Sequence, residues 1–372
     1  MLEKADSAKQ YQLMRTTPIP RLILGMSWPS VISMIITLIY NTADTYFVSH
    51  IDASASAAVG AVYAIMAILQ ALGFGLAMGS SSIISRKLGQ KKDDEAQVYF
   101  ASAFFASVGA GVIAGGLGLL FLNPLLKVLG CSATMMPYAT PYAMWILIAA
   151  PVSCSVNVLN STLRAGGQVA IAMIGVGLGG LINLALDPLF IFTLGMGTGG
   201  AALATDVSNA ISFLILLAVF LTKRAVVPRR LKAISGQWRT YRDVITTGLP
   251  TVFRQGLGSL AAAVTTVQAV VYGDAVVAAV NIAGKVYILM RNIIIGIGQG
   301  FVPVAGYNFG AGDRERTWQS FTFTVKLGTL LCLGATVLVA LFPAPIMRWF
   351  SEDEEVVRIG VEILYFTAAV MP

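Results

Sequence analysis

The chain has 372 residues, of which 56% are hydrophobic and only 12% are charged, about half the charged share of an average soluble domain. This composition indicates a membrane protein, and with 37 glycines and 14 prolines it excludes a disordered chain and a coiled coil. The three cysteines and the single histidine match no zinc or redox spacing, so neither metal nor thiol chemistry is expected. The net charge of +7 could suggest a nucleic-acid partner, but membrane topology explains it more simply, and we expect none.

Apolar runs long enough to cross a bilayer follow one another along the chain. A span needs about 20 mostly apolar residues. None of the runs alternates polar and apolar residues as a membrane barrel does, so the sequence predicts an all-α polytopic membrane protein. The ten predicted helices cover residues 21–48, 57–85, 98–122, 137–162, 169–194, 199–222, 244–271, 275–303, 319–342 and 356–372.

The basic residues predict the orientation. With the N-terminus inside, 19 of the 25 Lys and Arg residues fall in cytoplasmic segments, as the positive-inside rule requires. These segments include an N-terminal stretch, residues 1–20, and a basic loop, residues 223–243. The run 223–232 is interpreted as part of a solvated loop between two halves, with phosphoinositide or nucleic-acid binding as the alternative.

A repeat relates the two halves of the sequence. Shifting the chain by 221 residues lays W-P-S-V (28–31) on L-P-T-V (249–252) and Gly79 on Gly300 without a gap. The offset spans six helices, an even number, so both halves enter the membrane from the same side. We therefore predict an N-lobe (21–222) and a C-lobe (244–372) related by a parallel repeat, with a cavity between them.

The same shift carries Pro151 onto Pro372, the final residue. Two complete six-helix lobes would give twelve helices in about 440 residues, whereas about ten helices are present here. The expectation is therefore a chain whose second lobe is truncated. The alternative is a natural variant with ten helices.

Four acidic residues fall well inside predicted helices, where a carboxylate costs at least a few kcal/mol: Asp44, Asp187, Asp206 and Glu362. Asn183 precedes Asp187 by four residues and therefore shares its helical face. Pro188 lacks a backbone N–H and should kink that helix.

Two carboxylates with neutral oxygen neighbours in one lobe suit either a sodium ion or a shared proton, because both cannot stay ionised at low cost in a low dielectric. Thr205 and Asp206, in the sixth helix, add a hydroxyl and a further acid. The structural alternative is that each aspartate caps a broken helix or bonds a Ser or Thr across the bundle. Glu362 could simply face the outer interface.

The C-lobe has basic rather than acidic residues inside its first two helices. Arg254, Lys285 and Arg291 have no acid in those helices to pair with, and they either line the central cavity or extend toward the interface. Nearby Tyr287 and Met290 could belong to an adaptable wall of a drug-binding cavity, or could be plain packing.

Several motifs, taken in order, resemble the multidrug and toxic compound extrusion (MATE) family. They are Y-N-T-A-D-T-Y-F-V (40–48), G-S-S-S-I-I-S-R-K-L-G (79–89), L-R-A-G-G-Q (163–168), I-N-L-A-L-D-P-L-F-I-F (182–192) and G-A-A-L-A-T (200–205). The likeness covers nearly the whole chain and is greatest for the bacterial branch that couples through its N-terminal lobe.

The resemblance implies a cation-driven antiporter, in which the N-lobe cation and proton site matches Asp44, Asn183, Asp187 and Thr205. Sodium, if it is the coupling ion, would sit at Asp44 and Asp187. Further candidates for this site are Asp206, Tyr40 and Asn41, and candidates for a substrate cavity are Arg254, Gln255, Met290 and Tyr287.

Other implications of the resemblance concern partners and location. Substrates would be amphipathic, often cationic compounds, exported in exchange for Na⁺ or H⁺ without a cofactor. The protein would be a monomer in the inner membrane of a bacterium. The seventh helix, G-L-P-T-V-F-R-Q-G-L-G-S-L (248–260), lacks the acid that some relatives carry, which argues against an ion site in that helix.

Three alternatives to a drug antiporter stay open. A lipid-linked saccharide flippase of the same superfamily would have a larger, more basic cavity, and the three basic residues of the C-lobe are its support. A non-transporting receptor or a channel is disfavoured by the repeat and by the carboxylates gathered in one lobe. A membrane enzyme has the least support, because no nucleophile with a base and no metal cluster is evident.

Overall fold

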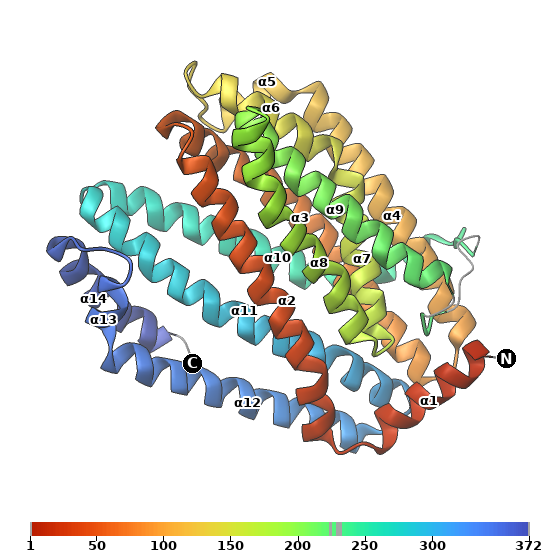
Figure 1. Cartoon of the computed structure of the whole chain (residues 1–372). Coiled ribbons are helices and arrows are strands. Elements are labelled where there is room, and N and C mark those ends of the chain that lie inside the picture. The colour runs from red at the N-terminus through yellow and green to blue at the C-terminus, as the bar shows by residue number, and fades with distance from the viewer. Residues whose placement is uncertain (1, 223–224, 228–232, 371–372) are drawn as a thin grey trace.

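The computed structural model describes residues 2–222, 225–227 and 233–370, and within them every regular element is a helix. This confirms the predicted all-α class. The N-lobe holds α2 to α9, and the C-lobe α10 to α14 (Figure 1). The elements are α1 (Leu2–Thr16), α2 (Ile19–Ser49), α3 (Ala53–Gly89), α4 (Asp93–Leu120), α5 (Leu122–Val128), α6 (Met136–Ile148), α7 (Ala150–Ala165), α8 (Val169–Pro188), the π-helix η1 (Leu189–Thr193), α9 (Gly197–Leu221), α10 (Trp238–Val270), α11 (Asp274–Gly310), α12 (Arg314–Leu341), α13 (Pro343–Arg348) and α14 (Glu354–Val370).

Each of the ten predicted segments contains a helix, but three are not single α-helices. Segment 98–122 runs past the end of α4 into α5, segment 169–194 passes from α8 into the π-helix η1, and segment 137–162 is broken. It is divided into α6 and α7, which are bent by 49° at their junction. Pro151 stands in the first turn of α7, where a ring without an N–H cannot continue the hydrogen-bond ladder of α6. Among the described residues, seven helices are long and apolar enough to cross a membrane, and the bent pair makes eight if it counts as one span.

The repeat is visible in the helix bounds. Moving α3 by 221 residues carries Ala53–Gly89 onto Asp274–Gly310, the bounds of α11. The same shift carries Asp93–Leu120, the bounds of α4, onto Arg314–Leu341, those of α12. The two lobes therefore repeat one arrangement of helices in the same direction, as the sequence predicts.

The lobes meet near α1 through glycines that let helix backbones touch. A Cβ atom on Gly89 of α3 would overlap the carbonyl oxygen of Tyr307 on α11, and one on Gly310 would overlap the carbonyl oxygen of Arg86. These two contacts are related by the 221-residue shift, since Arg86 corresponds to Tyr307 and Gly89 to Gly310. The seam between the lobes is therefore built from equivalent contacts.

Polar contacts add to this seam. Arg316 on α12 donates from Nη2 to the carbonyl oxygens of Met14 (3.2 Å) and Thr17 (2.8 Å), at the end of α1. Arg164, at the end of α7, donates to the side chain of Gln299 on α11, and both residues are buried. The lobes converge at this end of the bundle, which we call the α1 end, and diverge toward the opposite end (Figure 1).

Candidate ion and substrate sites

Small residues on α8 bring three helices of the N-lobe together. A Cβ atom on Gly180 would lie 2.9 Å from atoms of both Ile36 and Tyr40 on α2. A Cβ atom on Gly179 would overlap the Ser212 hydroxyl of α9. Because these positions carry no side chain, α2 and α9 approach α8 closely. Polar residues of α2 and α9 can therefore lie near those of α8.

An asparagine joins two of these helices. The amide nitrogen of Asn183 lies 3.2 Å from Oδ1 of Asp187, one turn further along α8, and 3.3 Å from the hydroxyl of Thr205 on α9. Asn183 and Asp187 are both fully buried, with 1% and 0% of their surface exposed. The structure therefore brings together three of the residues that the sequence selected.

Four side-chain oxygens on α2, α8 and α9 are buried and, among the described residues, have no hydrogen-bond partner. They are Oδ1 of Asp44, Oδ1 of Asn183, Oδ2 of Asp187 and Oδ2 of Asp206. A buried polar atom without a partner costs about 1–3 kcal/mol, and its presence calls for an explanation such as a bound ion or proton. All four are oxygens, the ligand type that suits a hard cation such as sodium and, on the carboxylates, a proton.

Tyr142 on α6 lies near the three aspartates and was not among the residues predicted for this site. Its side chain is 1% exposed, and the hydroxyl lies within electrostatic range of Asp44, Asp187 and Asp206. The hydroxyl also lies 3.6 Å from the sulfur of Met66 on α3. A tyrosine inside an apolar helix was the available signal, but Tyr142 is remote in sequence from the three aspartates, so nothing in the sequence connected it with them.

The other N-lobe candidates lie around this cluster. Tyr40 packs on Gly180 and is partly buried, close to Asp44. Asn41 is exposed, and its amide donates to the carbonyl oxygen of Thr37 in its own helix at 2.8 Å, so it does not join the acids. Within the described residues, no group of three or more His, Cys, Asp or Glu side chains could hold a metal ion. A sodium ion here would therefore depend on amide and hydroxyl oxygens beside the carboxylates.

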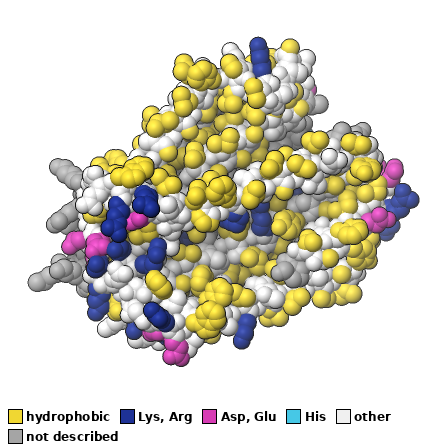
Figure 2. Space-filling view, turned by 180° about the vertical axis from the view of Figure 1, so that it is seen from behind, with side chains coloured by type: hydrophobic (Ala, Val, Ile, Leu, Met, Phe, Trp, Pro, Cys, Tyr) yellow, Lys and Arg dark blue, Asp and Glu magenta, His cyan; other side chains and the backbone are white. Residues whose placement is uncertain are grey.

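The C-lobe candidates form a separate group. Arg254 on α10 is exposed and lies within electrostatic range of Arg291 on α11. Tyr287 is 42% exposed, and Gln255 and Met290 are partly buried. Figure 2 shows dark-blue basic side chains in the hollow between the two largely yellow bodies of the molecule.

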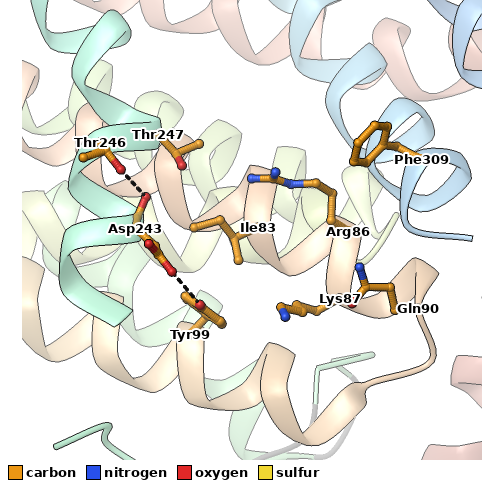
Figure 3. A pocket seen from close by; sticks show the side chains of 9 residues that line it. All are labelled: Ile83, Arg86, Lys87, Gln90, Tyr99, Asp243, Thr246, Thr247 and Phe309. Carbon is orange, nitrogen blue, oxygen red and sulfur yellow. Dashed lines mark hydrogen bonds between the residues drawn. The ribbon is translucent and has the colours of Figure 1, made fainter. Parts of the chain in front are cut away.

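A further cavity of about 320 Å³ lies at the α1 end, between the lobes (Figure 3). Arg86 and Lys87 enter it from α3, Tyr99 from α4, Asp243 from α10 and Phe309 from α11. The Tyr99 hydroxyl donates to Oδ2 of Asp243 at 3.1 Å, which joins the N-lobe to the C-lobe. None of the residues that line this cavity belongs to the aspartate cluster. The cavity is part of the seam between the lobes.

The three cysteines form no disulfide bond with one another in the structure. Cys131, Cys154 and Cys332 are free, and the first two are buried. Burial raises the pKa of the Cys131 thiol, which lies in a loop outside the spans, and so disfavours its reactive thiolate form.

Comparison with known proteins identifies the family. The family model MatE matches residues 29–189 and 250–372, which cover most of both lobes. The chain belongs to the MatE family of MATE transporters.

Individual MATE relatives are similar over almost the whole chain. The FAD transporter of Shewanella oneidensis is 26% identical over 361 residues, which are 96% of this chain and 79% of that protein. The multidrug export protein MepA of Staphylococcus haemolyticus is 27% identical over 350 residues, 93% of this chain and 76% of its own. A solved outward-facing multidrug resistance MATE transporter superposes with a TM-score of 0.92 at 27% identity, covering 98% of this chain and 81% of that one.

Proposed function

We propose that this MATE protein is a secondary antiporter, which exports amphipathic, often cationic compounds in exchange for Na⁺ or H⁺. The observation that carries the proposal is the group of buried oxygens without partners on Asp44, Asn183 and Asp187. A site of this kind is more stable with a cation or proton bound than without, so occupancy can bias one arrangement of the helices around it.

The proposed topology assigns the side of the membrane to which the structure is open. With the N-terminus inside the cell, the α1 end is cytoplasmic, and the convergence of the lobes there describes a transporter closed to the cytoplasm. Alternating access requires the seam at Gly89 and Gly310 to separate while the opposite end closes. We place the protein in the inner membrane of a bacterium, as a monomer.

The relatives support export of organic compounds but differ in what their names state. MepA is named a multidrug export protein, whereas the Shewanella relative is named a FAD transporter. Both names state the transport of organic compounds, and only that class is carried over from them to this chain.

The test is ethidium efflux from vesicles that contain the full chain, under an imposed sodium or proton gradient. Asp44→Asn and Asp187→Asn should each reduce gradient-driven efflux at least about tenfold, because the amide cannot take up or release the coupling charge. Asp52→Asn is the matched control, since Asp52 caps α3 by accepting from the backbone N–H of Ser54 and asparagine caps equally well.

The gradient that drives efflux identifies the ion. Equal efflux by the wild type and both cluster variants, with normal insertion into the membrane, would contradict coupling at this site. Efflux that neither gradient drives would contradict antiport itself.

A further inference from the structure

Two arginines occupy the middle of the C-lobe helices. Arg254 is residue 17 of the 33 in α10, and Arg291 is residue 18 of the 37 in α11. Each lies at least ten residues inside its predicted span (244–271 or 275–303), which is about 15 Å or more at a rise of 1.5 Å per residue. An arginine side chain is much shorter than that distance, so extension to the membrane surface does not explain these charges. An ionised residue near the bilayer centre points to a function.

The two guanidinium groups lie near each other, where α10 and α11 are neighbours in the C-lobe. Nη1 of Arg291 comes within 3.8 Å of the position that a Cβ atom would take on Gly258, one turn beyond Arg254. Arg254 and Arg291 are also within range of mutual electrostatic repulsion. Both side chains are exposed, and two like charges this close repel each other unless an anion lies between or beside them.

The described residues supply no such anion. Neither arginine takes part in any ion pair recorded for the described residues. The acids of the two helices stand near their ends, with Asp243 in the second turn of α10 and Asp274 at the start of α11. An external anion is therefore the partner that this arrangement fits.

The neighbouring residues narrow the class of anion. Two adjacent guanidinium groups match the double charge and the several acceptor oxygens of a phosphate monoester, to which arginine donates in pairs. Tyr287 lies one turn before Arg291 on the same face of α11 and is 42% exposed, so its ring can stack on a planar aromatic group.

We propose that Arg254, Arg291 and Tyr287 form a substrate subsite for organic anions that carry a phosphate beside a planar aromatic ring. The inference rests on the proposed transport function and adds a class of anionic substrates to it. The subsite lies on helices of the C-lobe, whereas the proposed coupling site lies in the N-lobe, so a phosphorylated substrate and the coupling ion can be bound at separate places.

The flavin series tests the proposal because its members share one fluorescent ring. Riboflavin carries no phosphate, and FMN adds a single phosphate monoester. We expect the full chain, purified into nanodiscs of phosphatidylcholine, to bind FMN at least about tenfold more tightly than riboflavin, as measured by fluorescence anisotropy. Charge-assisted hydrogen bonds from the arginines to the phosphate oxygens, which riboflavin cannot accept, are the origin of that factor.

Variants locate the effect on the arginines. Arg254→Gln and Arg291→Gln should each weaken FMN binding about tenfold and leave riboflavin binding within about twofold, whereas Arg254→Lys should lose less. Arg348→Gln is the control, since Arg348 is an exposed arginine paired with Glu354 at the protein surface. Where a variant fails to fold, competition by inorganic pyrophosphate against FMN on the wild type gives the same information.

Several outcomes overturn the proposal. These are equal affinity for FMN and riboflavin, equal losses for both ligands in the arginine variants, and no competition by pyrophosphate. Loss of the preference for FMN in nanodiscs with phosphatidylglycerol would show that lipid phosphate occupies the arginines, which also overturns it. The ethidium assay separates the two proposals. If efflux depends on Asp44 but the protein shows no preference for FMN over riboflavin, the transport proposal is supported and the phosphate subsite is contradicted.

Discussion

The two lobes share a scaffold but differ in charge. The bounds of α3 and α4 fall on those of α11 and α12 after one shift, and the seam contacts occur in equivalent pairs. The same shift relates Asp44 to Thr265, and it relates Arg254 and Arg291 to Ser33 and Gln70. The N-lobe interior is thus acidic where the C-lobe is neutral, and the C-lobe is basic where the N-lobe is neutral.

This difference shows which features a repeat conserves. The glycines of the seam are constrained by backbone contacts that both lobes need in order to close. The interior polar residues face no equivalent requirement, and each lobe can therefore carry a different chemistry on one fold. In our proposals the acidic lobe handles the coupling ion and the basic lobe handles an anionic part of the substrate.

The largest expected effect tests whether the scaffold is equivalent in the two lobes. Gly89→Ala and Gly310→Ala should each destabilise the closed seam by about 3 kcal/mol, because either methyl group overlaps a backbone carbonyl that cannot rotate away. Thermal unfolding in detergent measures the change. The two variants should lose similar stability, because their contacts are equivalent.

Controls for these substitutions exist on the same helices. Gly60 on α3 and Gly298 on α11 have no atom within 4 Å of an added Cβ, so alanine there should be neutral or should stabilise by up to about 1 kcal/mol. A large loss for one seam variant and none for the other would show that the repeat does not extend to the seam.

The helices and the repeat were predicted well from the sequence. The length of each apolar run, and the glycine and charged residues that end it, can be read from the sequence without knowing the fold. The break between α6 and α7 was missed, although Pro151 was visible, because prolines also occur inside continuous helices such as α2 and α10. Tyr142 was missed for a different reason. Its significance depends on which residues surround it, and that arrangement results from glycine contacts between helices distant in the sequence.

A smaller effect is expected from the amide of the N-lobe cluster. Asn183→Leu removes the group that bonds Asp187 and Thr205, and it should weaken gradient-driven efflux about tenfold while the preference for FMN over riboflavin is unchanged. Asn41→Leu is the control on α2, because that amide bonds only its own helix. A change in FMN preference caused by Asn183→Leu would contradict the division of roles between the lobes.

The smallest effect concerns a position where equivalent residues of the two lobes differ. The repeat relates Arg316 to Glu95, which pairs with Lys87 and Lys92, whereas Arg316 bonds the end of α1. Arg316→Ala should cost about 1 kcal/mol, since it leaves the Thr17 carbonyl oxygen without its donor, whereas the Met14 carbonyl oxygen still accepts from the side-chain amide of Asn308. Arg15→Ala should cost less than about 1 kcal/mol, because its ion pair with Asp313 is partly exposed and screened by solvent. Thermal unfolding of the two variants measures both losses of stability. An equal loss would contradict the view that the hydrogen bonds from Arg316 to the carbonyl groups of α1 hold α1 to the C-lobe more firmly than the ion pair of Arg15 does.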